Sequence, residues 1–199
     1  MIEGDGPNFS FGASVEEHLP GNYETMMPAF GRLFRTMLDS SVICLAAVRG
    51  HCLGGGLEIA SFCHRVFAAH DARLGQPEIV LGVFAPIASV ILTERVGRSR
   101  AEDLCLSGRV ISADEALRIG LVDDVVQDPA AAAIAYVKEH LLPRSASSLR
   151  MAQRAVRTGL TRRLTSELED VESLYLNHLM KTHDAEEGLG PEFLREVLG

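Results

Sequence analysis

A glycine triplet between an apolar run and a helical pattern is the feature that most constrains the fold. The run "VICLAAVRG" (42–50) is continuously apolar and ends in glycine, which is typical of a buried strand. "HCLGGGLEIA" (51–60) continues into the helical pattern "GGLEIASFC", and "RVFAAHDARLG" (65–75) follows as a second strand. Strand, glycine turn, helix and strand form a βαβ unit, which predicts an α/β fold with a mostly parallel sheet covered by helices.

The position of the glycines suggests a binding role for the backbone. N–H groups at the start of a helix carry partial positive charge, and glycine lets a ligand approach them closely. The phosphate-loop pattern is absent, because Gly56 and Leu57 occupy the positions of its lysine and hydroxyl residue. The dinucleotide-binding pattern is also absent, because Ile59 occupies the position of its third glycine. Two interpretations stay open, an oxyanion hole made of N–H donors and close packing of helix against sheet.

Composition narrows the class of protein. The chain has 199 residues, 47% of them hydrophobic, which is enough for one sizeable core. The net charge of −8 argues against a nucleic-acid-binding surface. The four cysteines form no CxxC pair, and we expect reduced, buried thiols. We find neither a signal segment nor an apolar run of membrane length, so we expect no membrane partner and a cytoplasmic location.

The second half of the chain is mostly helical in its patterns. "SADEALRIG" (112–120) begins with a capping box from Ser112 to Glu115 and ends at Gly120, and "LVDDVV" then predicts a short strand. Apolar spacing predicts helices at about 130–141, 145–158 and 164–183. The apolar stripe of the last segment is either core or a subunit interface. We therefore expect a core over residues 1–130 and a helical region over 131–199.

Two carboxylates suggest proton-transfer chemistry. Glu58 lies one helical turn beyond Gly55 in an otherwise apolar helix, where burial of a charge is costly. Glu78 follows Pro77 between apolar segments, where a rigid loop can hold it. Two such carboxylates beside N–H donors are suited to acid–base work on a stabilised enolate.

Several segments together resemble a known family. "FSFGASVEE" (9–17), "VRGHCLGGGLEIA" (48–60) and "ARLGQPEIVLGV" (72–83) look like the signature segments of the crotonase, or enoyl-CoA hydratase/isomerase, superfamily. "SADEALRIGLVDDVV" and "DAEEGLGPEFL" resemble its later landmarks in the same order. The resemblance implies repeated ββα units followed by a C-terminal helical trimerisation region.

The resemblance also assigns site residues. It implies that the N–H groups of Phe11 and Gly55 hold a thioester oxygen, and that Glu58 and Glu78 handle water and the α-proton. Having both glutamates favours a hydratase. The substrate-binding positions that it implies are Ser10, Gly12, Ala13, Gly54, Phe84 and Pro86.

The same resemblance implies the partners. The substrate is an acyl-CoA thioester, so coenzyme A belongs to the substrate, and no metal or redox cofactor is needed. The chain is expected to form a homo-oligomer, a trimer or a dimer of trimers.

Three departures from the family pattern stand out. "GVFAPIASVIL" (82–92) replaces a glycine-rich stretch and resembles the cyclohexa-1,5-diene-1-carbonyl-CoA hydratases within the superfamily. Phe84 then either faces a flat, cyclic acyl group or fills core. Ser14 stands where many members carry Asp. Only "MIEGDGPN" precedes the "FSFGA" segment, so we expect the core to lack the usual first strands and helix.

The alternatives to a hydratase also remain open. Within the same fold, the chain could catalyse isomerisation or another reaction of a CoA thioester. From a different class, it could be a catalytically impaired, truncated subunit of a larger assembly. The pair Glu58 and Glu78 argues against the second alternative, since a subunit without activity has no physical need for two costly carboxylates.

Overall fold

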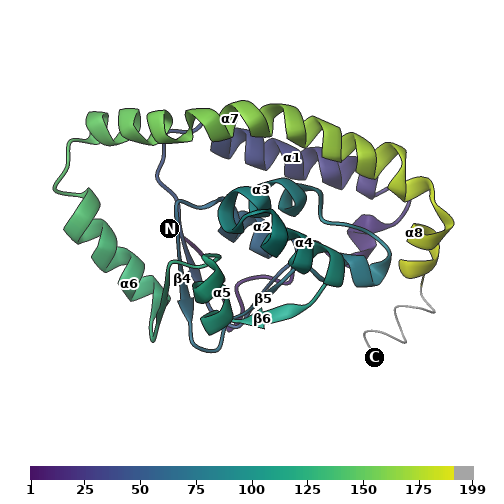
Figure 1. Ribbon diagram of the computed structural model, residues 1–199, viewed down its shortest axis with the longest axis horizontal. Helices are drawn as coiled ribbons and strands as arrows, with labels where there is room; N and C mark the ends of the chain where they lie inside the picture. Colours follow the sequence, from purple (N-terminus) through teal and green to yellow (C-terminus); the bar gives the residue numbers. More distant parts are fainter. Residues whose placement is uncertain (191–199) are drawn as a thin grey trace.

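The computed structural model describes residues 1–190 and contains two sheets (Figure 1). The first has four parallel strands in the order β1-β2-β4-β7, which are β1 (Ile2–Glu3), β2 (Leu45–Val48), β4 (Arg65–Ala69) and β7 (Asp124–Val126). The second has the order β3-β5-β6, which are β3 (His51–Leu53), β5 (Arg73–Gly75) and β6 (Val110–Ser112). Its β3 and β5 are parallel, and its β5 and β6 are antiparallel.

The chain steps from the first sheet to the second after β2 and again after β4. "RVFAAHDARLG", expected as one strand, is two: β4 ends at Ala69 and β5 begins at Arg73 in the other sheet. β2 and β3 are divided in the same way at Gly50, whose φ of +54° suits glycine. The predicted parallel βαβ unit is confirmed, but a short strand of the second sheet follows each of its strands, and β3 lies in the segment expected to be the glycine turn. The repeated ββα units that the resemblance implied are therefore present.

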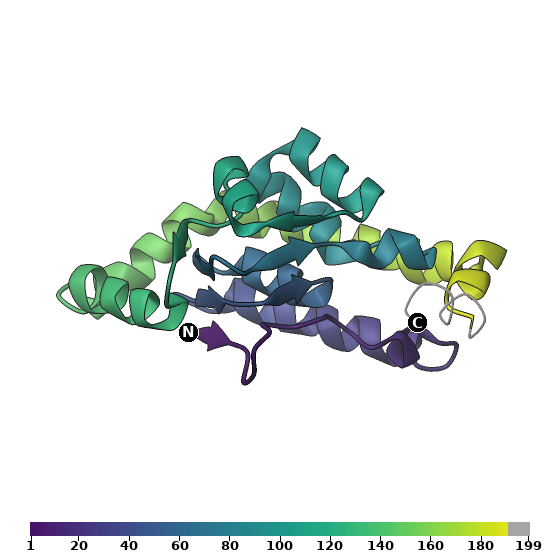
Figure 2. The ribbon, with the colours of Figure 1, turned by 90° about the horizontal axis from the view of Figure 1, so that it is seen from below.

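The helices pack on several sides of the two sheets, and the N-terminal strand β1 lies at the lower border of the view in Figure 2. They are α1 (Tyr23–Asp39), α2 (Gly55–Phe62), α3 (Pro86–Val96), α4 (Arg98–Ser107), α5 (Ala113–Ile119), α6 (Pro129–Tyr136), α7 (Ala146–Asn177) and α8 (His183–Gly188). Shorter helical turns are η1 (Val15–His18), η2 (Pro77–Leu81), η3 (Val137–Leu141) and η4 (Leu179–Lys181). None of the helices described in residues 1–190 is long and apolar enough to cross a membrane.

The C-terminal helices differ from the prediction. The expected helices 145–158 and 164–183 are one continuous helix, α7, that ends at Asn177. It lies along α1 (Figure 1), and Arg35 of α1 binds Glu172 of α7 at 2.7 Å. The segment between the two expected helices contains no proline, and Leu160 and Leu164 continue the apolar face across it. That burial outweighs the modest helix cost of Gly159.

Two other expectations concern the C-terminal part. The helix expected at 130–141 is confirmed as α6 and η3, and the expected boundary at residue 130 falls inside the first turn of α6. The landmark "DAEEGLGPEFL" (184–194) contains all of α8 except its first residue, while residues 191–194 lie outside the described part of the chain.

The N-cap Ser112 and the C-terminal Gly120 of α5 are confirmed, but the expected capping box is only half formed, because the Glu115 carboxylate binds Arg109 and not the Ser112 N–H. The Ser112 side chain accepts a hydrogen bond from the Glu115 N–H at 3.3 Å, and Gly120 adopts a left-handed conformation at the C-terminus. The Glu115 carboxylate binds Arg109 at 2.9 Å. The short strand expected in "LVDDVV" is β7, at the border of the first sheet.

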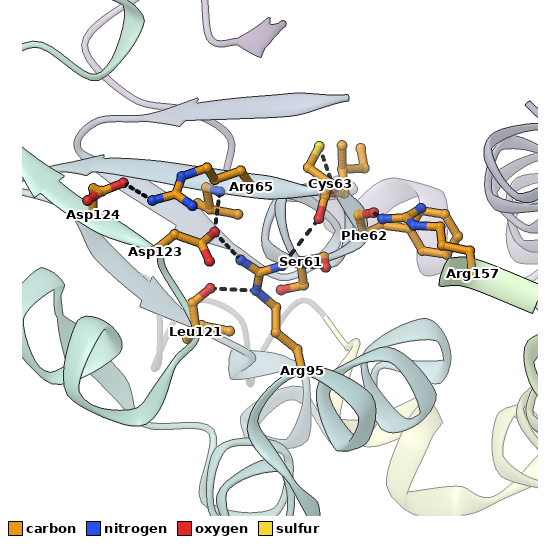
Figure 3. A network of polar contacts seen from close by, with 11 residues as sticks. Ser61, Phe62, Cys63, Arg65, Arg95, Leu121, Asp123, Asp124 and Arg157 are labelled. Carbon is orange, nitrogen blue, oxygen red and sulfur yellow. Dashed lines mark hydrogen bonds and ion pairs between the residues drawn. The ribbon is translucent and has the colours of Figure 1, made fainter. Parts of the chain in front are cut away.

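A mostly buried arginine, Arg95, joins α3 to the first sheet (Figure 3). Arg95 donates to the Leu121 carbonyl at 2.7 Å, to the Cys63 carbonyl at 3.2 Å and to Asp123 Oδ2 at 2.7 Å. The same Asp123 oxygen accepts from the Val66 N–H of β4 at 2.7 Å. This network sets the position of α3 relative to the sheet, and the N-terminus of α3 borders the candidate site.

We expect Arg95→Met to lower the free energy of unfolding by about 2–4 kcal/mol, because it leaves Asp123 and two carbonyls without a charged donor. The Arg95 side chain is only 13% exposed, so water replaces the lost donor poorly. Chemical denaturation measures the effect. The matched control Arg163→Met breaks an ion pair to Glu94 whose arginine is 50% exposed, and it should cost less than about 1 kcal/mol. Equal losses in the two variants would contradict the structural role of Arg95.

Candidate active site

Each glycine of the triplet is in close contact with a different neighbour. A Cβ on Gly54 would lie 2.7 Å from Glu78 Oε1, and one on Gly56 would lie 2.6 Å from Ser10 Cβ. A Cβ on Gly55 would lie 3.1 Å from the ring of Phe30. Gly54 also has a φ of +53°. The packing interpretation of the triplet is therefore correct, and the packing brings Glu78 close to the start of α2.

The loop that carries Phe11 also meets the start of α2. A Cβ on Gly12 would lie only 2.9 Å from the Gly55 nitrogen. The amides on either side of Phe11 are both held: Ser10 N–H donates to the His51 carbonyl at 3.0 Å and Gly12 N–H to Ser10 Oγ at 3.1 Å. Gly55 is the first residue of α2, where an N–H has no acceptor within the helix. The two amides predicted to be oxyanion donors thus belong to adjacent, anchored segments.

The substitution of Ser14 for the more usual Asp leaves that loop well held. The Ser14 side chain accepts from the Glu17 N–H at 3.3 Å, and the Glu17 carboxylate accepts from the Ser14 N–H at 2.7 Å. This reciprocal pair is a capping box at the start of η1, a role that serine and aspartate both fill.

Glu58 is buried against the N-terminus of α3. Its side chain points from α2 to the Ala88 N–H, which donates to Oε1 at 2.6 Å, and Glu58 is only 3% exposed. The N-terminus of a helix favours negative charge, which offsets part of the cost of burying this carboxylate.

Glu78 is held by η2, which begins at Pro77. The proline restricts the backbone immediately before the glutamate, as the rigid-loop prediction required. Gln76, on the other side of the proline, is 1% exposed and lies beside the Glu78 carboxyl group.

A single cavity brings most of the predicted residues together. The predicted residues that line it are Phe11, Gly12, Ala13, Gly54, Gly55, Glu58, Glu78, Phe84 and Pro86. Ser10 does not line this cavity; its side chain instead holds the Gly12 amide and packs on Gly56. The other walls are mostly apolar and include Met26, Met27, Phe30, Leu81 and Val83.

Sequence reasoning missed Tyr175 and Gln76 as residues of this region. Tyr175 lines the cavity from α7, and its ring meets that of Phe84 edge to face at 5.6 Å. It belongs to an apolar stripe whose members Leu164 and Leu168 are core, so spacing alone did not distinguish it. Gln76 could have been identified from the sequence, because it is a polar residue between a predicted buried strand and Pro77.

The electrostatics of the two carboxyl groups are coupled. Burial raises the pKa of Glu58 to about 8, and the negative charge of Glu78 adds to that rise. Burial also raises the pKa of Glu78 to about 7. Both shifts favour a single shared proton on the pair near neutral pH, since two adjacent charges with little access to water repel each other. Such a pair can donate and accept a proton beside an oxygen held by N–H groups.

We expect the contribution of Glu58 to the free energy of unfolding to decrease as the pH rises from about 4.5 to about 8, because folded Glu58 retains a proton that the unfolded chain releases in this range. Glu58→Gln removes this titration. Its free energy of unfolding should therefore exceed that of the wild type by roughly 1–3 kcal/mol above pH 8 and approach it in acid. Denaturation at several pH values measures the difference. The exposed Glu169→Gln is the matched control, and a pH-independent difference for Glu58→Gln would contradict the prediction.

Comparison with known proteins agrees with this arrangement. The family model for enoyl-CoA hydratase/isomerase matches residues 1–194. Cyclohexa-1,5-dienecarbonyl-CoA hydratase of Thauera aromatica is 53% identical over 189 residues, which are 95% of this chain and 73% of the relative.

Solved structures show the same fold. An enoyl-CoA hydratase/isomerase from Mycobacterium paratuberculosis has a TM-score of 0.87 at 24% identity, over 94% of this chain and 77% of that one. An enoyl-CoA hydratase from Thermoplasma volcanium has a TM-score of 0.73 at 31% identity, over 94% of this chain and 76% of that one. The resemblance seen in the motifs is confirmed, and the chain belongs to the enoyl-CoA hydratase/isomerase family.

Proposed function

We propose that this protein is a hydratase that adds water to an α,β-unsaturated acyl-CoA thioester, with a cyclic dienoyl thioester as its substrate. The observation that carries the proposal is the pair of carboxyl groups in one cavity beside the start of α2, the buried Glu58 and the partly buried Glu78. Membership of the family and the similarity to a dienoyl-CoA hydratase support the same conclusion.

The backbone amides of Phe11 and Gly55 bind the thioester oxygen in this proposal. Addition of water to the double bond places negative charge on that oxygen as the enolate forms. Each preorganised donor in a comparable oxyanion site is worth about 2.7–4 kcal/mol. The anchoring of both segments supports this role, since fixed donors need no reorganisation during the reaction.

Glu58 and Glu78 share the proton transfers. The ionised carboxylate accepts a proton from water as the water oxygen bonds to the β-carbon, and the protonated carboxyl group gives its proton to the α-carbon. One proton is taken and one is delivered, so hydration needs no other reactant. The raised pKa values of both groups suit an exchange of this kind near neutral pH.

Phe84 and Pro86 are proposed to contact the acyl group. Phe84 is partly exposed, lines the cavity and meets Tyr175, so an apolar aromatic wall borders the two glutamates. A flat ring can stack on or meet such a wall edge to face. This observation supports a cyclic acyl group over the interpretation of Phe84 as core alone.

The proposed chemistry needs no metal or redox cofactor, because the amides and carboxyl groups supply charge stabilisation and proton transfer. Coenzyme A enters as part of the substrate. We also propose a cytoplasmic location, which the four unpaired cysteines support.

We expect the protein to hydrate cyclohexa-1,5-diene-1-carbonyl-CoA faster than crotonyl-CoA, as measured by the loss of enoyl-thioester absorbance. Glu58→Gln and Glu78→Gln should each lower kcat by about 10²–10⁴-fold, since each removes one proton-transfer group. Retention of more than about a tenth of the activity in either variant would contradict the shared role.

Controls separate the parts of this proposal. Phe84→Leu keeps an apolar side chain without the ring, and it should slow the diene more than crotonyl-CoA. Turnover of crotonyl-CoA alone would refute the cyclic substrate and leave the hydratase. Double-bond migration without hydration would identify an isomerase instead.

We further propose that the protein is a homo-oligomer, a trimer or a dimer of trimers. Large apolar side chains are exposed on the N-terminal half of α7 and beside it, with Val156 86%, Leu142 69% and Met151 59% exposed. Exposed apolar groups gathered in one region are typical of a subunit interface.

We expect light scattering to give a mass of three or six chains, and Val156→Glu to lower that mass by placing charge in the interface. Glu169→Arg, at an exposed position in the C-terminal half of α7, is the matched control and should leave the mass unchanged. A monomeric wild-type protein would contradict the proposal.

A further inference from the structure

Tyr175 brings a further polar group to the candidate site. It lies near the C-terminal end of α7, and its side chain lines the cavity that contains Glu58 and Glu78. Tyr175 is only 1% exposed, and its phenol oxygen is buried without a hydrogen-bond partner among residues 1–190. A buried tyrosine hydroxyl group normally has a partner, so this oxygen needs a physical explanation.

Packing holds the ring of Tyr175 but does not account for its hydroxyl group. The ring belongs to a cluster with Tyr23, Val83 and Met180, and the ring of Phe84 meets it edge to face at 5.6 Å. In the described part of the chain, none of these contacts supplies a hydrogen bond to the phenol oxygen. A phenylalanine would make the same contacts without burying an unpaired hydroxyl group, which is costly. The O–H group therefore points to a partner that arrives with a ligand.

The phenol lies within electrostatic reach of the two carboxyl groups. Burial raises the pKa of Tyr175 above its usual value, and the negative charges of Glu78 and Glu58 raise it further. The phenol therefore keeps its proton near neutral pH and remains a hydrogen-bond donor. Neither carboxyl group accepts this hydrogen in the structure, so the donor is available to another group in the cavity.

The size of the cavity brings a bound acyl group close to Tyr175. The cavity has a volume of about 80 Å³, so an acyl group that enters it comes into contact with its walls. Tyr175 and the two glutamates border the same space, where the proposed hydration adds a water oxygen to the acyl group. A water or hydroxyl oxygen has two acceptor sites besides its own hydrogen. It can therefore accept from the Tyr175 O–H while its own hydrogen is donated to a carboxylate.

We propose that Tyr175 is a further catalytic residue, whose O–H donates a hydrogen bond to the oxygen that is added to the acyl group. This oxygen belongs to the attacking water before the reaction and to the β-hydroxyl group of the product after it. Tyr175 keeps its proton throughout, since Glu58 and Glu78 carry out both proton transfers. The catalytic role rests on the proposed function, but the hydrogen bond also predicts a preference for hydroxyacyl thioesters that is measurable without turnover.

Binding of two CoA thioesters that differ by one hydroxyl group is the direct test. The ligands are 2-hydroxycyclohexane-1-carbonyl-CoA and cyclohexane-1-carbonyl-CoA, and calorimetry in the Glu58→Gln background keeps dehydration too slow to interfere. With Tyr175 present, the hydroxy thioester should bind roughly 3- to 30-fold more tightly, which corresponds to one buried hydrogen bond. Adding Tyr175→Phe should bring the two dissociation constants to within about twofold of each other. Equal binding in the presence of Tyr175, or a preference that Tyr175→Phe leaves intact, would overturn the proposal.

The stability of the ligand-free protein gives a second, independent measurement. Tyr175→Phe should leave the midpoint of chemical denaturation unchanged or raise it, because it removes a buried hydroxyl group that has no partner. Tyr136→Phe is the matched control for both measurements, since Tyr136 is a partly exposed tyrosine of α6 that packs on Phe67 and does not line the cavity. A midpoint for Tyr175→Phe below that of the control would show that the hydroxyl group already has a partner in the free protein, which contradicts the proposal.

Kinetics separate the role of Tyr175 from the proposed reaction. We expect Tyr175→Phe to lower kcat for hydration of cyclohexa-1,5-diene-1-carbonyl-CoA by roughly 3- to 30-fold, whereas Tyr136→Phe leaves it unchanged. An unchanged kcat in Tyr175→Phe would refute the catalytic role. If the wild type hydrates no enoyl-CoA while Tyr175 still gives a preference for the hydroxy thioester, the proposed function fails and the hydrogen bond to the ligand stands.

Discussion

The hydrogen bond from the Ala88 N–H to Glu58, at 2.6 Å, is the interaction on which the site depends. It places a carboxyl group that begins in α2 against the N-terminus of α3, where the helix dipole favours its charge. Burial and the nearby Glu78 act in the opposite direction and raise the pKa of Glu58. The balance of these effects favours one shared proton on the pair, which suits the proposed acid–base chemistry near neutral pH.

That interaction needs α3 in a defined place, and the fold provides it from the opposite end. Arg95 near the C-terminus of α3 binds Asp123, which in turn accepts from the Val66 N–H of β4. Ion pairing at one end of the helix thus supports carboxylate burial at the other. The site and the packing of the sheet are parts of one arrangement, so changes far from the cavity can alter its electrostatics.

The glycine triplet shows how packing and chemistry share residues. Gly54 and Gly56 are needed for close contacts with Glu78 and Ser10, which the sequence alone offered as one of two interpretations. Because those contacts bring Glu78 and the Phe11 loop to the start of α2, the packing also assembles the proposed oxyanion donors. The close-packing interpretation and the proposed oxyanion hole therefore apply to the same stretch of backbone.

The amino-acid sequence by itself determined the βαβ unit, the caps of α5 and the family, since these depend on apolar periodicity and on motifs that are local in the chain. It also indicated Glu58 and Glu78, because a carboxylate in an apolar segment is conspicuous. Only the tertiary structure decided that "RVFAAHDARLG" is shared between two sheets and that α7 is continuous, because burial against distant elements outweighs local propensity. Only the tertiary structure also placed Tyr175 and Gln76 beside the carboxyl pair. Tyr175 reaches the cavity from α7, which is far from Glu58 and Glu78 in the sequence, and Gln76 lies next to the Glu78 carboxyl group across Pro77.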